Sequence, residues 1–231
     1  MAPPSDAAAA RLTLPEELLL LALDPGSGRV QGLMWVRYGM AAAALMELER
    51  AGAVRPEHGG KRFRVTGAAP ASDPQLSDVR RALDPADRPR TTSWLGRRPQ
   101  KDLVEVYAQR LAARGAVRVH PHRTLRFFPS TRYPVTDRAL AAAERATVDA
   151  AAESTASSAA GGESAPADAR ALRLAALVGA VQLGRRLYPG AGHRAVRHRL
   201  TALAKADWVA NAVRSKVTST QGAMASSGGG G

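Results

Sequence analysis

The sequence predicts a mainly α-helical protein, a single globular domain around an apolar central helix with short β-hairpins. Three observations indicate this class. Apolar side chains recur at helical spacing through most of the chain, and capping residues or glycines stand where these stretches begin and end. Two short β-type runs each accompany a turn. The 231 residues suffice for one domain with a core, and the absence of cysteine excludes disulfides and thiolate metal sites.

The N-terminal helix carries the clearest signals. Thr13 is placed to cap it, and Glu16, three residues later, completes a capping box. The residues that follow are nearly all leucine up to position 23, so this helix should be buried on more than one side. A turn at 24–28 ends it, and residues 29–36 are expected to form a short strand or hairpin arm.

The next segment predicts a helix followed by a hairpin. The apolar residues of 39–51 fill a broad helix face, and Gly52 supplies a left-handed stop. Val54 and residues 63–65 flank the sequence His-Gly-Gly-Lys, which is typical of a hairpin turn.

Two helices and a second hairpin should follow. The Asp-Pro pair at 73 opens a helix whose apolar residues share one face. Residues 101–114 carry apolar side chains in a four-residue row and end before Gly115. The second hairpin is expected from strands at 117–119 and 125–128, with the turn at His-Pro-His-Arg.

The C-terminal third is expected to be helical. Thr136 caps a helix to about residue 152, and the low-complexity stretch 153–167 should be a mobile loop. Residues 169–187 are apolar on almost all sides, which predicts the central core helix. Two further helices are expected at 194–203 and 206–217. The domain should therefore span 11–217, with a flexible N-terminus over 1–10 and a disordered tail over 218–231.

The charge is strongly basic, +13 from 33 Lys and Arg against 20 Asp and Glu. The excess lies in two blocks, 55–138 and 170–231, and suits a polyanion or an anionic membrane. The longest strongly apolar run, residues 18–23, is too short to span a bilayer, which needs ~20 residues. Because no secretory signal pattern is present either, we expect a soluble protein of a reducing compartment.

Catalytic patterns are missing from the sequence. It contains neither a glycine-rich phosphate loop nor a Gly-x-Ser-x-Gly elbow, and its five histidines lack metal-ligand spacing. The paired carboxylates Glu16 and Glu17 are explained by their place at a helix N-terminus. We therefore expect no enzyme, no metal and no cofactor.

Six segments occur in an order that resembles the Golgi phosphoprotein 3 (GPP34) family. These are LTLPEELLLLALDPGSG (12–28), GMAAAALMELERAGAV (39–54), SDPQLSDVRRAL (72–83), LAARGAVRV (111–119), RYPVTD (132–137) and LRLAALVGAVQL (172–183). The resemblance implies a helical domain peripheral to the cytoplasmic face of a membrane. It further implies binding of phosphatidylinositol 4-phosphate on a basic face, recruitment of membrane-protein cargo tails as an adaptor, and a projecting hairpin that forms homo-oligomers or touches the bilayer.

Eukaryotic members of this family hold the lipid with a tryptophan, an arginine of the second helix and two later arginines. Without gaps these positions fall on Gly32, Ala41, Lys101 and Val104, of which only Lys101 keeps its charge. This departure favours a general preference for anionic phospholipid over recognition of one phosphoinositide.

Neighbouring residues can supply the missing side chains. The resulting candidate headgroup-binding set is Trp35, Arg37, Arg97, Arg98 and Lys101. Each cation near an anionic surface contributes about 1 kcal/mol, so several of them give reversible binding.

The second hairpin supplies the candidate residues for membrane insertion or self-association, Leu125, Phe127 and Phe128. An inserted phenylalanine would add about 1.5–3 kcal/mol of apolar burial. The alternative for both phenylalanines is packing against the core.

A nucleic-acid-binding protein of the winged-helix type is the alternative function. The helices at 13–23 and 39–51 and the hairpin at 53–66, with its basic tip, have the order of such a module. Alanines stand where a recognition helix would carry base-reading Arg, Asn or Gln, which disfavours nucleic acid as the partner.

Overall fold

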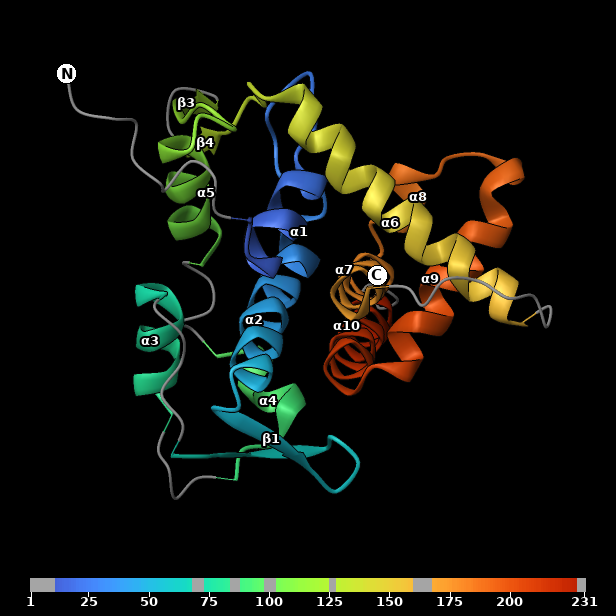
Figure 1. Ribbon diagram of the computed structural model, residues 1–231. Coiled ribbons are helices and arrows are strands. Elements are labelled where there is room, and N and C mark those ends of the chain that lie inside the picture. Colours follow the sequence, from blue (N-terminus) through green and yellow to red (C-terminus); the bar gives the residue numbers. More distant parts are fainter. Residues whose placement is uncertain are drawn as a thin grey trace.

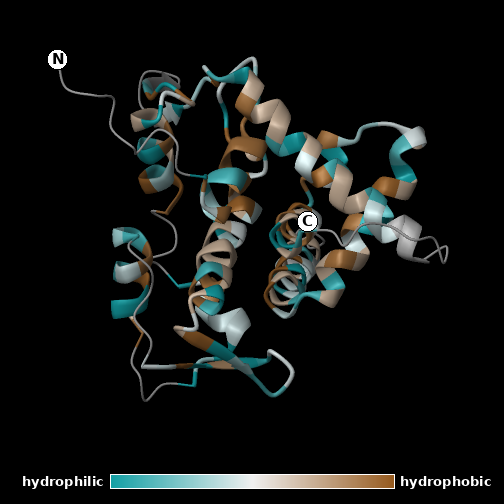
Figure 2. Cartoon of the chain, viewed as in Figure 1, coloured by the Kyte–Doolittle hydropathy of each residue, from teal (hydrophilic) through white to brown (hydrophobic). Residues whose placement is uncertain are grey.

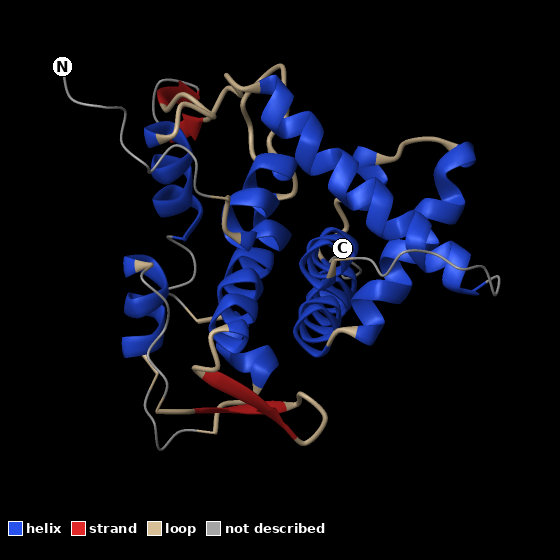
Figure 3. Cartoon of the chain, viewed as in Figure 1, coloured by secondary structure: helices blue, strands red, loops and turns tan. Residues whose placement is uncertain are grey.

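The computed structural model describes residues 11–67, 73–83, 88–97, 103–124, 128–159 and 168–227. Within these ranges it contains ten α-helices, a short 3₁₀ helix and two antiparallel sheets of two strands each (Figure 1). In the view of Figure 3, the two sheets lie at opposite ends of the group formed by α2, α3 and α5. The expected class, a single mainly α domain, is confirmed.

The elements of the first part of the chain are α1 (Leu14–Ala22), α2 (Leu33–Arg50), β1 (Val54–Glu57), β2 (Arg62–Val65), α3 (Pro74–Arg81), α4 (Thr91–Leu95), α5 (Leu103–Ala113), β3 (His120–Thr124) and β4 (Phe128–Arg132). Those of the second part are α6 (Arg138–Ala159), α7 (Ala169–Ala180), α8 (Gly184–Leu187), η3 (Ala191–His193), α9 (Arg194–Ala206) and α10 (Trp208–Ser227).

Two helices form the middle of the core. Residues 40–46 of α2 are fully buried, and their alanines allow neighbouring helices to approach closely. Helix α7 contacts α1, α2, α6, α9 and α10 and buries residues 174–178. Figure 2 shows apolar residues concentrated in α1, α2 and α7 at the centre of the view. The expected central helix is therefore present as α7.

The central helix is shorter than its sequence predicted. α7 ends at Ala180, and Gln182 adopts a left-handed φ of 61° before α8 begins. The side chains of Gln182 and Gln221 are hydrogen-bonded to each other, which ties this turn to α10. A contact between residues so far apart in sequence leaves no local signal for the break.

The strand expected at 29–36 is wrong. Val30 forms only an isolated bridge with Leu23, and α2 begins at Leu33. Gly28 and Gly32 both have positive φ, so the chain between them folds into a compact loop.

The strands of the second hairpin have other bounds than expected. β3 spans His120–Thr124 and pairs with β4 from His120↔Arg132 to Thr124↔Phe128, while Val117 makes an isolated bridge with Val135. The sequence His-Pro-His-Arg thus lies in a strand. Its proline is tolerated because both strands of a two-stranded sheet are edge strands. The first hairpin, with β1 paired to β2, is as expected.

Two helices extend past their expected ends. α6 continues to Ala159, into the low-complexity stretch, and α10 continues to Ser227, into the segment expected to be a disordered tail. The side chain of Gln221, which is hydrogen-bonded to that of Gln182, holds the added part of α10 against the domain.

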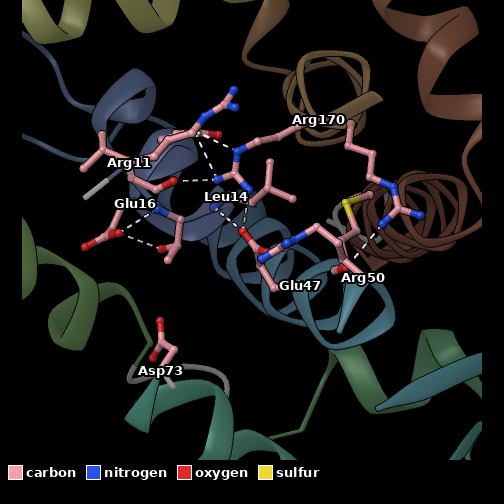
Figure 4. Close-up of polar contacts among 12 residues, drawn as sticks. Arg11, Leu14, Glu16, Glu47, Arg50, Asp73 and Arg170 are labelled. Atoms are coloured by element: carbon pink, nitrogen blue, oxygen red, sulfur yellow. Dashed lines mark hydrogen bonds and ion pairs between the residues drawn. The ribbon is translucent and has the colours of Figure 1, made fainter. Parts of the chain in front are cut away.

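A buried cluster of ion pairs fastens α1 to its neighbours (Figure 4). Arg170 of α7 donates to Glu47 of α2 at 2.8 Å and to Glu17 of α1 at 3.1 Å. Glu47 also accepts the N–H of Leu14 at 2.9 Å. On the other side of α1, Glu16 contacts Arg110 of α5 at 3.2 Å.

The N-terminal capping box explains half of this arrangement. One carboxylate oxygen of Glu16 accepts from the N–H and the hydroxyl of Thr13, and the other oxygen faces Arg110 of α5 and Arg114, which follows α5. The sequence thus predicted the local role of Glu16 correctly. Its ion pairs with a distant helix carry no local signal.

Burial raises the pKa of Glu17 to about 7, because the effect of burial is larger than the opposite effect of Arg170. The nearby carboxyl of Glu144 also raises this pKa, and Arg11 lowers it. A carboxyl whose pKa is higher in the folded state destabilises that state as it ionises. Its contribution to stability therefore falls as pH rises from about 4.5 to about 7.

We expect Glu17→Gln to remove this dependence on pH. Relative to the parent protein, the variant should gain on the order of 2 kcal/mol in free energy of unfolding between pH 4.5 and pH 7. Urea unfolding at a series of pH values measures the difference. A constant difference across this range would contradict the burial of an ionisable Glu17.

Candidate functional site

A basic pocket lies where α2 begins. It has a volume of about 680 Å³ and is lined by residues of the α1–α2 loop, the start of α2, helices α5 and α8, and the end of β4 with the residues after it. Its lining includes four arginines from four separate parts of the chain, Arg29, Arg37, Arg132 and Arg186. Two carboxylates, Asp24 and Glu105, also line it.

The loop before α2 is closed by Asp24. Its carboxylate accepts from the N–H of Ser27 at 2.7 Å, the hydroxyl of Ser27 at 2.8 Å and the amide of Gln31 at 2.9 Å. The hydrogen bond from the Ser27 N–H is the main cause that lowers the pKa of Asp24. Asp24 therefore serves mainly to shape the loop that presents Arg29.

Gly28 docks this loop on the segment after β4. Its φ is +66°, and a Cβ at this position would lie 2.5 Å from the nitrogen of Pro134. The N–H of Tyr133 donates to the carbonyl of Gly28 at 2.6 Å. Only glycine permits this approach, which brings Arg29 into the same pocket as Arg132.

Arg37 and Arg132 are the best placed of the four arginines to hold an anion. The Nε atom of each is buried and has no hydrogen-bond partner among the described residues. A buried donor without a partner costs about 1–3 kcal/mol, so a shift of either side chain that brings its guanidinium group to an acceptor in the pocket is favoured. A guanidinium can donate two parallel hydrogen bonds to a phosphate or a carboxylate.

The remaining arginines, Arg29 and Arg186, are exposed at the rim. Within the described ranges none of the four pocket arginines forms an ion pair, in contrast to Arg170 and Arg110 of the buried cluster. The two carboxylates of the lining, Asp24 and the exposed Glu105, offset only part of the charge of the four arginines. The pocket is net positive and can accept an anion.

The structure separates the residues that the sequence grouped as a headgroup site. Arg37 lines the pocket. Trp35 is half-buried next to Tyr38, with ring centroids 6.3 Å apart, and does not line it. Arg97 lines another hollow, beside Trp94.

Other candidates cannot be placed. Arg98, Lys101, Leu125 and Phe127 lie outside the described residues, and of Phe128 only its position at the start of β4 is described. Their roles stay predictions.

Sequence reasoning missed Arg29, Arg132 and Arg186. Arg29 directly follows the turn predicted at 24–28, and Arg132 is the first residue of the segment RYPVTD, which carries the family resemblance. Both arginines therefore lie next to features that the sequence made recognisable. Nothing local relates them to Arg186 on α8, since only the folded chain brings these positions together.

Fold and pocket together define a mainly helical domain with an arginine-lined pocket at the start of α2. Among the described residues, no helix combines the length and apolar character needed to cross a membrane. The sequence model of Golgi phosphoprotein 3 (GPP34) matches residues 14–220. The chain belongs to this family, as its segments indicated, and the family suggests a lipid-binding or adaptor role. A search of curated proteins finds no match.

Proposed function

We propose that this protein binds anionic phospholipid through its basic pocket and acts at the cytoplasmic face of a membrane without crossing it. One observation carries the proposal: Arg37 and Arg132 both line one pocket of about 680 Å³, and the buried Nε atom of each has no hydrogen-bond partner among the described residues. A phosphate-bearing headgroup supplies the acceptors that these donors need.

The position of the pocket supports the same ligand. Gly32 and Val104 both line it, and these are positions on which the lipid-holding tryptophan and one arginine of eukaryotic family members fall. The pocket would thus bind lipid at the same place in the fold as in eukaryotic family members, but with a different set of arginines. Such a replacement fits a preference for negative charge more than for one phosphoinositide.

The expected binding is reversible and sensitive to salt. Each arginine near an anionic surface contributes about 1 kcal/mol, so four of them give a few kcal/mol. This attraction is screened within about 8–10 Å at physiological ionic strength. Adaptor activity toward cargo tails, and self-association, are further parts of the proposal that rest on the family.

The alternative of a nucleic-acid-binding winged helix has less support. Its recognition helix would be α2, but Ala41–Ala44 on that helix are fully buried. Side chains that are buried in the core cannot reach base edges.

Vesicle co-sedimentation tests the proposal. We expect Arg37→Gln/Arg132→Gln to weaken binding to vesicles of equal parts phosphatidylcholine and phosphatidylserine about 30-fold, because two charges are lost. Glu105→Gln should strengthen binding severalfold, because it removes one of the two opposing charges of the pocket. Replacing phosphatidylserine with phosphatidylinositol 4-phosphate tests for preference between headgroups.

Arg194→Gln/Lys205→Gln is the matched control, since it removes two charges from exposed positions of α9 outside the pocket. This control should change binding only a few-fold. Equal losses in both double variants, or equal binding to vesicles of pure phosphatidylcholine, would overturn the proposal.

A further inference from the structure

Two large apolar side chains are exposed side by side at the start of α2. Leu33 is 39% exposed and Met34 is 43% exposed, whereas Val36 on the same helix is fully buried. Among the described residues only one other large apolar side chain, Met224, is exposed to a similar degree. Leu33 and Met34 therefore stand out from an otherwise well-buried apolar set.

These side chains lie beside the basic pocket. Leu33 lines it together with Gly32, and Met34 follows on the next position of the helix. The exposed arginines Arg29 and Arg186 line the same pocket. Apolar side chains surrounded by cations suit the surface of an anionic bilayer, where phosphates lie above the first acyl carbons. The cations can contact the phosphates while the apolar side chains reach the acyl carbons.

Folding of the chain does not require this exposure. Gly32 caps α2 with a φ of 64° and without a side-chain hydrogen bond, so the helix start is set by the loop. Polar residues at the two exposed positions would serve the helix as well.

We infer that Leu33 and Met34 insert into the interfacial region of an anionic bilayer while the adjacent pocket holds a lipid headgroup. The inference rests on the proposed function and deepens it, because it fixes the orientation of the bound protein. The N-terminus of α2 then points toward the membrane. The opposite end of α2, with β1 and β2, points away from it (Figure 1).

Because the chain has no cysteine, a single cysteine can carry an environment-sensitive fluorophore. We expect NBD-labelled Met34→Cys to shift its emission to the blue and to brighten severalfold with vesicles of equal parts phosphatidylcholine and phosphatidylserine. Lipids with a nitroxide near the top of the acyl chain should quench it. NBD-labelled Ala202→Cys on α9, also exposed, should do neither.

Co-sedimentation of the same labelled proteins separates the two claims. If Met34→Cys pellets with acidic vesicles but its emission stays as in water, insertion is overturned and the pocket proposal stands. If neither it nor the parent protein pellets with acidic vesicles, both are overturned. Unlabelled Met34→Ser should bind about fivefold more weakly with an unchanged dependence on salt, since it loses apolar burial and no charge. Equal affinity to the parent protein would contradict insertion.

Discussion

Arg170→Met is expected to lower the free energy of unfolding by about 3–5 kcal/mol at neutral pH, because it leaves buried carboxylates without their counter-charge. The side chain of Arg170 is only 14% exposed and is shared by Glu17 and Glu47, which are 3% and 2% exposed. It also donates to the carbonyl of Leu12, which fixes the chain before α1. Urea unfolding followed by circular dichroism measures the loss.

The loss should shrink as pH is lowered. Without Arg170, burial raises the pKa of Glu17 further, and Glu47 loses one of the partners that lower its pKa, so protonation relieves the unpaired charge. Arg81→Met is the matched control: it breaks an ion pair with Asp78 whose two side chains are 75% and 58% exposed. That variant should unfold almost as the parent does. Equal effects of the two substitutions would refute the role of the buried cluster.

Gly179→Ala is expected to destabilise the protein by about 3 kcal/mol or to displace α9, because the two helices touch at this glycine. A Cβ on Gly179 of α7 would lie 2.2 Å from the carbonyl oxygen of Leu200 and 2.6 Å from its carbonyl carbon. These are backbone atoms of α9, so no side-chain rotation relieves the clash. Thermal and urea unfolding of the variant measure the cost.

Gly222→Ala provides the comparison for this glycine. Gly222 lies in α10, is exposed and has no atom within 4 Å of an added Cβ. The same exchange there should stabilise the helix by about 0.5–1 kcal/mol, since alanine has the higher helix propensity. If both variants changed stability alike, close packing of α7 on α9 would be excluded as the cause.

The local signals predicted much of the fold. The capping box at Thr13 located the start of α1, the alanine-rich face located α2 from residue 39 onward, and the glycine turn after β1 located the first hairpin. These features depend on interactions within a few residues, which is why the sequence reveals them. The ends of helices that contact distant parts of the chain were predicted wrongly. The end of α7 is an example: Gln182, which follows it, is hydrogen-bonded to Gln221 of α10.

The site was predicted only in part. Arg37 was recognised because it lies one turn from a position that the family resemblance marked. Trp35 and Arg97 were grouped with it by proximity along the chain, yet the structure places both outside the pocket. Distance along a sequence says little about which side of a helix, or which end of a domain, a side chain occupies.

By itself the sequence determined the helical class, the family, the positive charge and one arginine of the pocket. Tertiary structure alone decided that arginines from four elements converge and that Leu33 and Met34 remain exposed beside them. The physical reason is that this convergence depends on contacts between distant segments, above all the docking of Gly28 against Tyr133 and Pro134. Such contacts form only when the whole chain is packed.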